Sequence, residues 1–328
     1  MDKDVDRAAR DAFVRGLRKS ELHVHIEGSV RPDMLYDIAR SRLGQKSPSR
    51  ADVQRLYKQD GFSDFLDHYK QIVRYLTNEE DFGLITGDLL SRLADQNVRY
   101  VELTFAPSVL EQFCGIDYDR LLHHTLAAIE CAERDLGIRS YLIIDLVRNM
   151  GADNARRMVD YAANSMDRRV VGITLGGDER AFPAAGFAEA FRLARDKGLG
   201  LSAHAGEAAG PESVWQCIDQ LGVARIGHGT SAVCDPALVK RLADLRVHVE
   251  CCITSNLLTG AVQNVQSHPI RRLFDSGVSV SINTDDPAMF GVSLVSEIDV
   301  AMTALGFSES EIEKMQLDTA AARFGACA

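Results

Sequence analysis

The sequence predicts an α/β fold in which eight parallel strands alternate with helices and close into a (β/α)8 barrel, known as a TIM barrel. Three observations predict this fold. Eight short apolar runs are spaced along the chain, helical patterns separate them, and polar residues of catalytic types follow several of the runs. The 328 residues, of which 46% are hydrophobic, are enough to bury one large core.

The strands are expected where apolar and β-branched residues gather in short runs. These runs cover residues 21–26, 98–105, 139–147, 170–175, 199–203, 224–226, 247–252 and 278–282. Helical spacing of apolar residues is clearest over 118–136, 154–163, 186–196 and 237–245. A doubly wound sheet is the competing arrangement, but it usually has fewer strands and a G-x-G-x-x-G turn after the first. No such turn follows Ile26.

Residues 1–328 are expected to form a single domain, with an N-terminal helix over 1–20 before the first strand. The second run begins far from the first, which leaves residues 28–97 as a helical insertion after strand one. Insertions at this place lie on the active-site face of a barrel. The segment is therefore a candidate lid region.

One face of a predicted helix in this insertion is apolar. Phe62, Phe65, Leu66 and Tyr69 follow the i, i+3, i+4, i+7 spacing. Such a stripe either closes over the site as a lid or packs on the barrel, and the spacing fits both.

Charge and composition exclude several classes of protein. Lys and Arg number 37 against 47 Asp and Glu, a net charge of −10, so the basic face that binds nucleic acid or an anionic membrane is not expected. The first twenty residues alternate charges without the apolar stretch of a secretory signal, and no run approaches ~18 apolar residues. The seven cysteines form no C-x-x-C, which fits reduced thiols and a cytoplasmic location.

Polar side chains gather where the predicted strands end. His23 and His25 share one face of the first strand, because side chains at i and i+2 point the same way. His204 ends the fifth strand, His228 ends the sixth, and a pair of aspartates, 285–286, follows the eighth. The carboxyl ends of barrel strands meet on one rim, and imidazole and carboxylate are ligands of Zn²⁺. A mononuclear zinc site is therefore predicted there.

Six segments resemble the adenosine deaminase family of the amidohydrolase superfamily and occur in that family's order. They include E-L-H-V-H-I-E-G-S, G-G-D-E, H-A-G-E, G-H-G-T, T-S-N with T-G-A-V, and N-T-D-D-P, at residues 21–29, 176–179, 204–207, 227–230, 254–262 and 283–287. H-A-G-E together with T-D-D-P is highly specific, whereas H-x-H alone is not. The resemblance covers nearly the whole chain and implies hydrolytic release of ammonia from a 6-aminopurine.

The resemblance also implies the metal site. His23, His25, His204 and Asp285 would bind one Zn²⁺ per chain, which makes water nucleophilic near neutral pH. Dinuclear relatives bridge two metals with a carboxylated Lys on the fourth strand, and residues 170–177 contain no Lys. The other zinc deaminase signature, H-x-E followed by P-C-x-x-C in the deaminases that act on nucleic acid, is incomplete because no P-C-x-x-C occurs.

The remaining roles follow from the same resemblance. The catalytic residues would be Glu207, which protonates N1, His228, which orients the attacking water and helps to deprotonate it, and the ligand Asp285. Asp286 would share a proton with N7, and the Gly177 N–H would meet N3. The expected substrate-binding residues are His25, Glu27, Gly177, Asp286, Phe62 and Phe65.

The group attached to N9 stays open at this point. Glu27 stands where adenosine deaminases proper have Asp, and Thr174-Leu175-Gly176-Gly177 replaces the more usual D-L-A-G. Adenosine is the expected substrate, giving inosine, with adenine and 6-aminodeoxyfutalosine as alternatives. Another mononuclear amidohydrolase reaction is the alternative class. A homo-oligomer is compatible with this fold, although no sequence feature specifies an interface.

Overall fold

The computed structural model describes residues 2–325. Met1 and the last three residues, Cys327 among them, lie outside the described residues. The strands lie within a few residues of the predicted runs. They are β1 (Lys19–His25), β2 (Val98–Phe105), β3 (Arg139–Asp145), β4 (Val170–Thr174), β5 (Gly200–Ala205), β6 (Arg225–His228), β7 (His248–Cys251) and β8 (Val280–Ile282).

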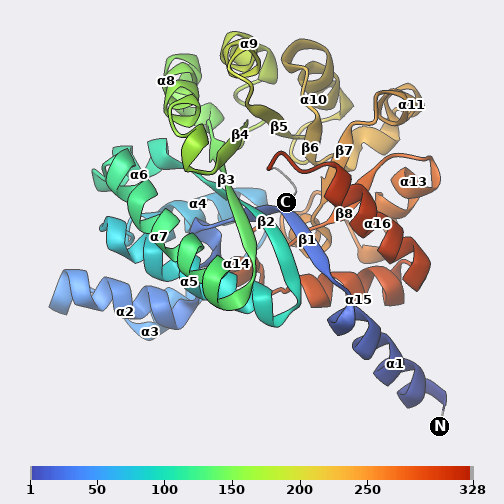
Figure 1. Ribbon diagram of the computed structural model, residues 1–328, viewed down its shortest axis with the longest axis horizontal. Coiled ribbons are helices and arrows are strands. Elements are labelled where there is room, and N and C mark those ends of the chain that lie inside the picture. The colour runs from blue at the N-terminus through green and yellow to red at the C-terminus, as the bar shows by residue number, and fades with distance from the viewer. Residues whose placement is uncertain (1, 326–328) are drawn as a thin grey trace.

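These strands form a barrel in sequence order (Figure 1). Every neighbouring pair from β1–β2 to β7–β8 is parallel. Val24 of β1 bridges Asp285 just beyond β8, and this contact brings the last strand back to the first. The predicted α/β barrel is thus confirmed.

Helices surround the strands, as parallel sheets require for burial on both faces (Figure 1). They are α6 (Pro107–Cys114), α7 (Tyr118–Leu136), α8 (Gly151–Ala163), α9 (Ala188–Asp196), α10 (Pro211–Gln216), α11 (Pro236–Leu245), α12 (Ile253–Leu258), α13 (Ile270–Asp275), α14 (Pro287–Phe290), α15 (Leu294–Ala304) and α16 (Glu309–Ala321). Local signals set their ends. The Asp117 side chain caps α7 by accepting the Arg120 N–H, and α7 ends at Gly137, whose left-handed conformation suits glycine.

The long connection between β1 and β2 is helical, as predicted. It holds α2 (Pro32–Leu43), α3 (Arg50–Arg55), α4 (Phe62–Val73) and α5 (Glu79–Asp95). α5 packs beside α7 and β2 in the outer ring, whereas α4 contacts α6 near the carboxyl ends of the strands. The predicted N-terminal helix is α1 (Asp2–Gly16), which packs on α15 and extends away from the barrel (Figure 1).

The described C-terminal segment packs beneath the barrel, at the amino ends of the strands. The Phe324 ring lies 3.7 Å from the Arg225 guanidinium, and a side chain added at Gly200 would collide with Phe324. The Gly325 N–H donates to the Tyr100 hydroxyl at 3.1 Å. This segment therefore covers the end of the barrel opposite the strand termini that carry the predicted site.

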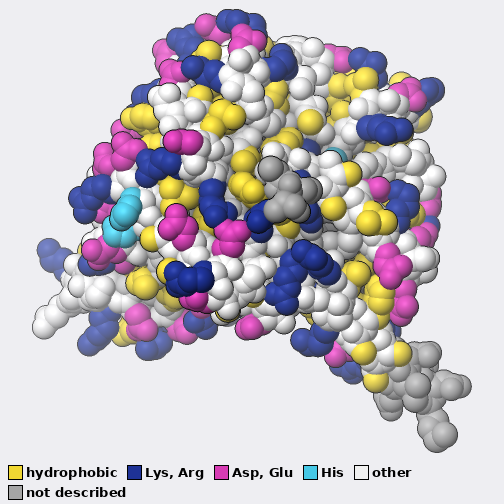
Figure 2. Space-filling view, in the orientation of Figure 1, with side chains coloured by type: hydrophobic (Ala, Val, Ile, Leu, Met, Phe, Trp, Pro, Cys, Tyr) yellow, Lys and Arg dark blue, Asp and Glu magenta, His cyan; other side chains and the backbone are white. Residues whose placement is uncertain are grey.

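No helix among the described residues is both long and apolar enough to cross a membrane. On the face shown in Figure 2, basic and acidic side chains are interleaved. That face lacks the single-sign basic stripe that binding to nucleic acid needs.

Candidate active site

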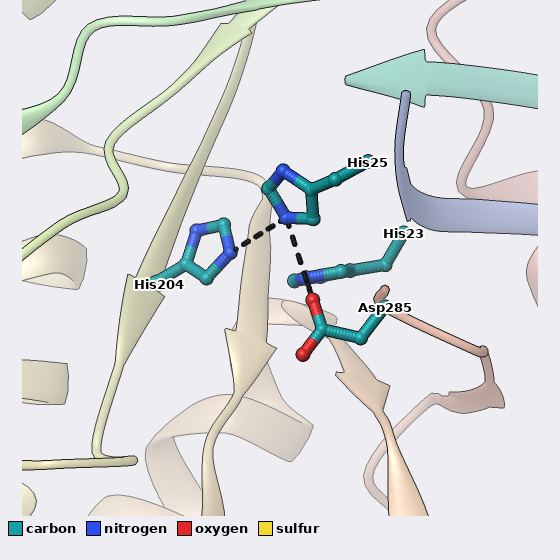
Figure 3. A group of neighbouring side chains, drawn as sticks. All are labelled: His23, His25, His204 and Asp285. Atoms are coloured by element: carbon teal, nitrogen blue, oxygen red, sulfur yellow. Dashed lines mark hydrogen bonds and ion pairs between the residues drawn. The ribbon is translucent and has the colours of Figure 1, made fainter. Parts of the chain in front are cut away.

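Three imidazoles and one carboxylate point toward one another at the carboxyl ends of β1, β5 and β8 (Figure 3). His25 Nε2 lies 3.3 Å from His204 Nε2 and 3.4 Å from Asp285 Oδ1. His23 Nε2 lies 3.1 Å from the same oxygen. Four ligand atoms around a tetrahedral Zn²⁺ are about 3.3 Å apart. The donor set and its spacing therefore fit one metal ion, and the structure brings together the four residues that the sequence grouped.

Three of the four residues already have the charge state that binds a metal ion. Burial lowers the pKa of His25 to about 4, and burial followed by the charge of His23 lowers the pKa of His204. Burial opposes ionisation of Asp285, but the His23 hydrogen bond and the nearby imidazoles outweigh it and hold the pKa well below its usual range. Burial opposes protonation of His23, but its hydrogen bonds to Asp285 and Glu250 raise its pKa to about 10. A metal ion that binds this ring must therefore displace a proton, whereas neutral His25 and His204 and ionised Asp285 already have the forms that bind metal ions.

The backbone is strained at two of the site residues. His228 and Asp285 have φ of +64° and +63°, a region that residues with a Cβ rarely adopt. Neighbouring glycines leave the necessary room. A Cβ at Gly227 would lie 2.8 Å from the His23 ring, and one at Gly28 would overlap the Asp286 carboxylate. These contacts explain physically why glycine occurs at both positions.

Buried charged side chains connect His23 to the far end of the barrel. His23 Nδ1 lies 3.0 Å from Glu250, and Arg225 joins Glu250 at 2.7 Å to Glu102 at 2.6 Å. The Tyr100 hydroxyl donates to Glu102 at 2.6 Å. Glu250 is placed to accept the Nδ1 proton of His23, which directs Nε2 of this ring toward the metal ligands and leaves its lone pair for a metal ion once Nε2 is deprotonated.

This row of buried, hydrogen-bonded side chains was not predicted from the sequence. Glu102, Arg225 and Glu250 each interrupt an apolar strand, and a charge inside a buried strand is a signal that a partner is required. Which strands supply the partners depends on the register of β2, β6 and β7, which the sequence does not reveal.

Replacing Arg225 with Gln is expected to lower the free energy of unfolding by about 3–5 kcal/mol, because two buried carboxylates lose their partner. Urea unfolding of the metal-free protein measures this loss. Arg271→Gln is the matched control, since Arg271 pairs with Asp275 and Glu311 in a partly exposed position. In this control variant the free energy of unfolding should fall by no more than about 1 kcal/mol. Equal losses of unfolding free energy in the two variants would contradict the assignment of Arg225 as the partner of both buried carboxylates.

Glu207 lies beside the four candidate metal ligands, which are called the metal cluster below. Its Oε1 accepts the Thr259 hydroxyl at 3.0 Å, and its Oε2 is 3.5 Å from His228 Nε2. Burial, and then the charge of Asp285, raises the pKa of Glu207 to about 8. The group therefore keeps its proton at pH 7 and loses it as the pH rises through about 8, so it can act as a general acid at neutral pH.

Glu179 holds the loop that carries Glu207. Its carboxylate accepts the backbone N–H groups of Gly206, Glu207 (3.2 Å), Ala208 (2.8 Å) and Ala209 (3.0 Å). In the sequence, Glu179 is the last residue of the G-G-D-E segment, which by itself indicates no role for it. The structure shows that it positions the H-A-G-E turn.

A cavity lies beside the four candidate metal ligands, three of which line it, and Glu207, His228 and Asp286 line it too. Gly177 lines it, as do Phe62 and Phe65 of α4, so these predicted binding residues do face the cavity. Its other apolar lining residues include Leu66, Tyr69, Val109, Phe113, Val147 and Met150. Movement of α4 as a lid stays a prediction.

Glu27, a predicted substrate-binding residue, is packed behind the residues that line the cavity. It is fully buried, is not among the residues that line the cavity in the described chain, and accepts the Ala106 N–H at 2.8 Å. Burial raises its pKa to about 7. Glu27 therefore supports the wall from behind.

Asp145, at the end of β3, is a cavity residue that the sequence reasoning missed. Its Oδ1 accepts the N–H groups of Val147 at 3.0 Å and Gly176 at 2.8 Å. In the described part of the chain, Oδ2 makes no hydrogen bond. An aspartate within the apolar run 139–147 was the available signal.

Comparison with known proteins agrees with this geometry. The family described as adenosine deaminase matches residues 18–326. An adenine deaminase of Rhizobium meliloti is 38% identical over 91% of each chain. The crystal structure of an adenine deaminase from Arthrobacter aurescens has a TM-score of 0.88 and 28% identity over 94% of each chain. An amidohydrolase from Burkholderia ambifaria with bound Zn has a TM-score of 0.90 and 28% identity, covering 97% of this chain and 89% of that one.

Proposed function

Because the chain belongs to the adenosine deaminase family, whose members are hydrolytic deaminases, we propose that it deaminates a 6-aminopurine with one Zn²⁺ and that it prefers the free base adenine. The products are hypoxanthine and ammonia. The observation that carries the choice of substrate is the free acceptor oxygen of Asp145 in the cavity wall.

The four clustered residues, His23, His25, His204 and Asp285, would hold the ion. Bound Zn²⁺ would make water nucleophilic near neutral pH. The short distances between the four ligand atoms support this ion, as does the zinc-containing neighbour.

The side chains around the cavity supply the rest of the chemistry. Attack at C6 places negative charge on the purine ring, and protonated Glu207 can neutralise it at N1. Asp286, whose pKa burial and the adjacent Asp285 raise well above the usual range, would hydrogen-bond to N7. The Gly177 N–H would bind N3. These contacts orient the ring with its amino group toward the metal.

Asp145 favours a free base because of its place beside Gly176 and Gly177. A Cβ at Gly176 would lie 2.5 Å from Asp145 Oδ2, so this oxygen is next to the turn assigned to the N3 edge. Free adenine carries an N–H at N9, beside N3, whereas a nucleoside carries carbon there. A carboxylate oxygen without a donor is suited to that N–H.

The test compares kcat/KM for adenine, 9-methyladenine and adenosine, with ammonia release as the measurement. Adenine should exceed 9-methyladenine by about 10- to 100-fold, the usual effect of losing a hydrogen bond to a charged group. In Asp145→Asn, the amide oxygen must still accept two backbone N–H groups, so the amide nitrogen replaces Oδ2 and faces N9–H. The rate with adenine should fall by about the same factor, and the rate with 9-methyladenine should change little.

Asp167→Asn, at an exposed position, is the control and should behave as wild type. Failure of the metal-loaded protein to deaminate any of the three purines would refute the deaminase function. Preference for adenosine, or an equal loss with all substrates in Asp145→Asn, would refute only the choice of free base.

A further inference from the structure

Three hydrogen bonds lead from a backbone amide to His228. The Ile270 N–H donates to His268 Nδ1 at 3.2 Å, and His268 Nε2 lies 3.3 Å from Asn256 Oδ1. Asn256 Nδ2 lies 3.0 Å from His228 Nδ1. The three side chains are at most 3% exposed, so solvent does not compete for these contacts.

The direction of these bonds is fixed at the backbone end. A backbone N–H can only donate, so His268 Nδ1 must accept, and the neutral ring then carries its proton on Nε2. The low pKa of His268, which burial reduces to about 3, agrees with a neutral ring. Its Nε2–H needs an acceptor, so Asn256 turns its oxygen to His268 and its amide N–H to His228.

The same reasoning fixes the ring of His228. Its Nδ1 accepts from Asn256, so the ring is neutral and its proton is on Nε2, the nitrogen that lies 3.5 Å from Glu207. The only lone pair available on the ring is thereby occupied. His228 has no free basic nitrogen to offer to a water in the cavity.

We propose that His228 is a fixed hydrogen-bond donor to the attacking oxygen rather than its base, and that Asn256 and His268 are positioning residues that keep the proton on Nε2. The water would lose one proton to solvent before attack, and N1 would receive its proton from Glu207. The Glu207 carboxylate would then pass the proton of the new C6 hydroxyl to the amino group, so that the C–N bond breaks with release of ammonia and the C6 carbonyl forms, and Glu207 would regain its proton from solvent. No proton passes through His228. The catalytic part of this inference rests on the proposed deaminase function. The location of the proton does not.

Asn256→Asp tests the inference, because an ionised carboxylate accepts from both neighbours. His268 Nε2–H would still donate to one oxygen, and His228 would move its proton to Nδ1 to donate to the other. A long-range ¹H–¹⁵N spectrum of the metal-free protein should show His228 protonated on Nε2 in wild type and on Nδ1 in Asn256→Asp. We expect kcat for the preferred 6-aminopurine to fall by about 10²- to 10⁴-fold, the range for a misplaced donor or tautomer.

Asn264→Asp is the matched control, since Asn264 is exposed and caps a turn through an oxygen that Asp retains. It should leave both the spectrum and kcat unchanged. Wild-type His228 protonated on Nδ1 would overturn the inference, as would a wild-type kcat in Asn256→Asp with the proton moved. The spectrum stands even if no purine is turned over, which separates this inference from the proposed function.

If Asn256→Asp does not fold, His268→Ala provides a second test. It removes the anchor, so Asn256 can face His228 with either end and both tautomers of His228 should appear in the spectrum. A single Nε2–H form in this variant would overturn the assignment of His268 as a positioning residue.

Discussion

Glu207→Gln is expected to lower kcat for the 6-aminopurine by about 10²- to 10⁴-fold, the contribution typical of a positioned general acid. Gln matches the shape of Glu207 and can still accept the Thr259 hydroxyl, but it has no proton to give to N1. Burial keeps native Glu207 neutral at pH 7, so the neutral Gln should leave stability and metal content close to wild type. Stopped-flow or steady-state ammonia release, together with metal analysis, measures both properties.

The control for this variant is Glu212→Gln, on the exposed side of α10. It makes the same chemical change close to the site and should leave kcat unaltered. A Glu207→Gln protein with wild-type kcat would remove Glu207 from the mechanism. Loss of metal from that variant would show that it acts through the metal cluster instead.

His204→Ala is expected to weaken metal binding by more than about 100-fold, since loss of a direct ligand should exceed the effect of losing a residue that only supports one. Turnover should fall with the metal content, because three donors remain where the cluster offers four. Competition with a chromogenic chelator measures the affinity, and elemental analysis measures the content. Added Zn²⁺ should restore part of the activity at high concentration by mass action.

His123→Ala, on the exposed surface of α7, is the control and should retain both metal and rate. If His204→Ala keeps full metal content and full activity, the four-residue cluster is not the metal site.

The barrel and the metal cluster were predictable because their signals are local. Apolar runs mark the strands, and His23, His25, His204 and Asp285 stand at strand ends that the fold brings to one rim. The helical stripe of Phe62 and Phe65 was also visible in the spacing, and both side chains do line the cavity.

The supporting residues were not predictable because their tasks depend on distant partners. Glu250 holds His23 across the barrel, and Asn256 links His268 to His228 between separate segments. Glu27 has a similar distant partner. Its motif predicts contact with substrate, which stays a prediction, whereas its hydrogen bond to the Ala106 N–H could not be foreseen. Such contacts follow from three-dimensional packing and not from sequence spacing.

The most direct test of the central claim is a titration of metal-free protein with Zn²⁺ while hypoxanthine formation from adenine is followed. The account predicts no turnover without metal, a linear rise as Zn²⁺ is added, and a break at one equivalent per chain. A break at two equivalents would contradict the mononuclear site. Absence of turnover of adenine and of every other 6-aminopurine by the loaded protein would contradict the function itself.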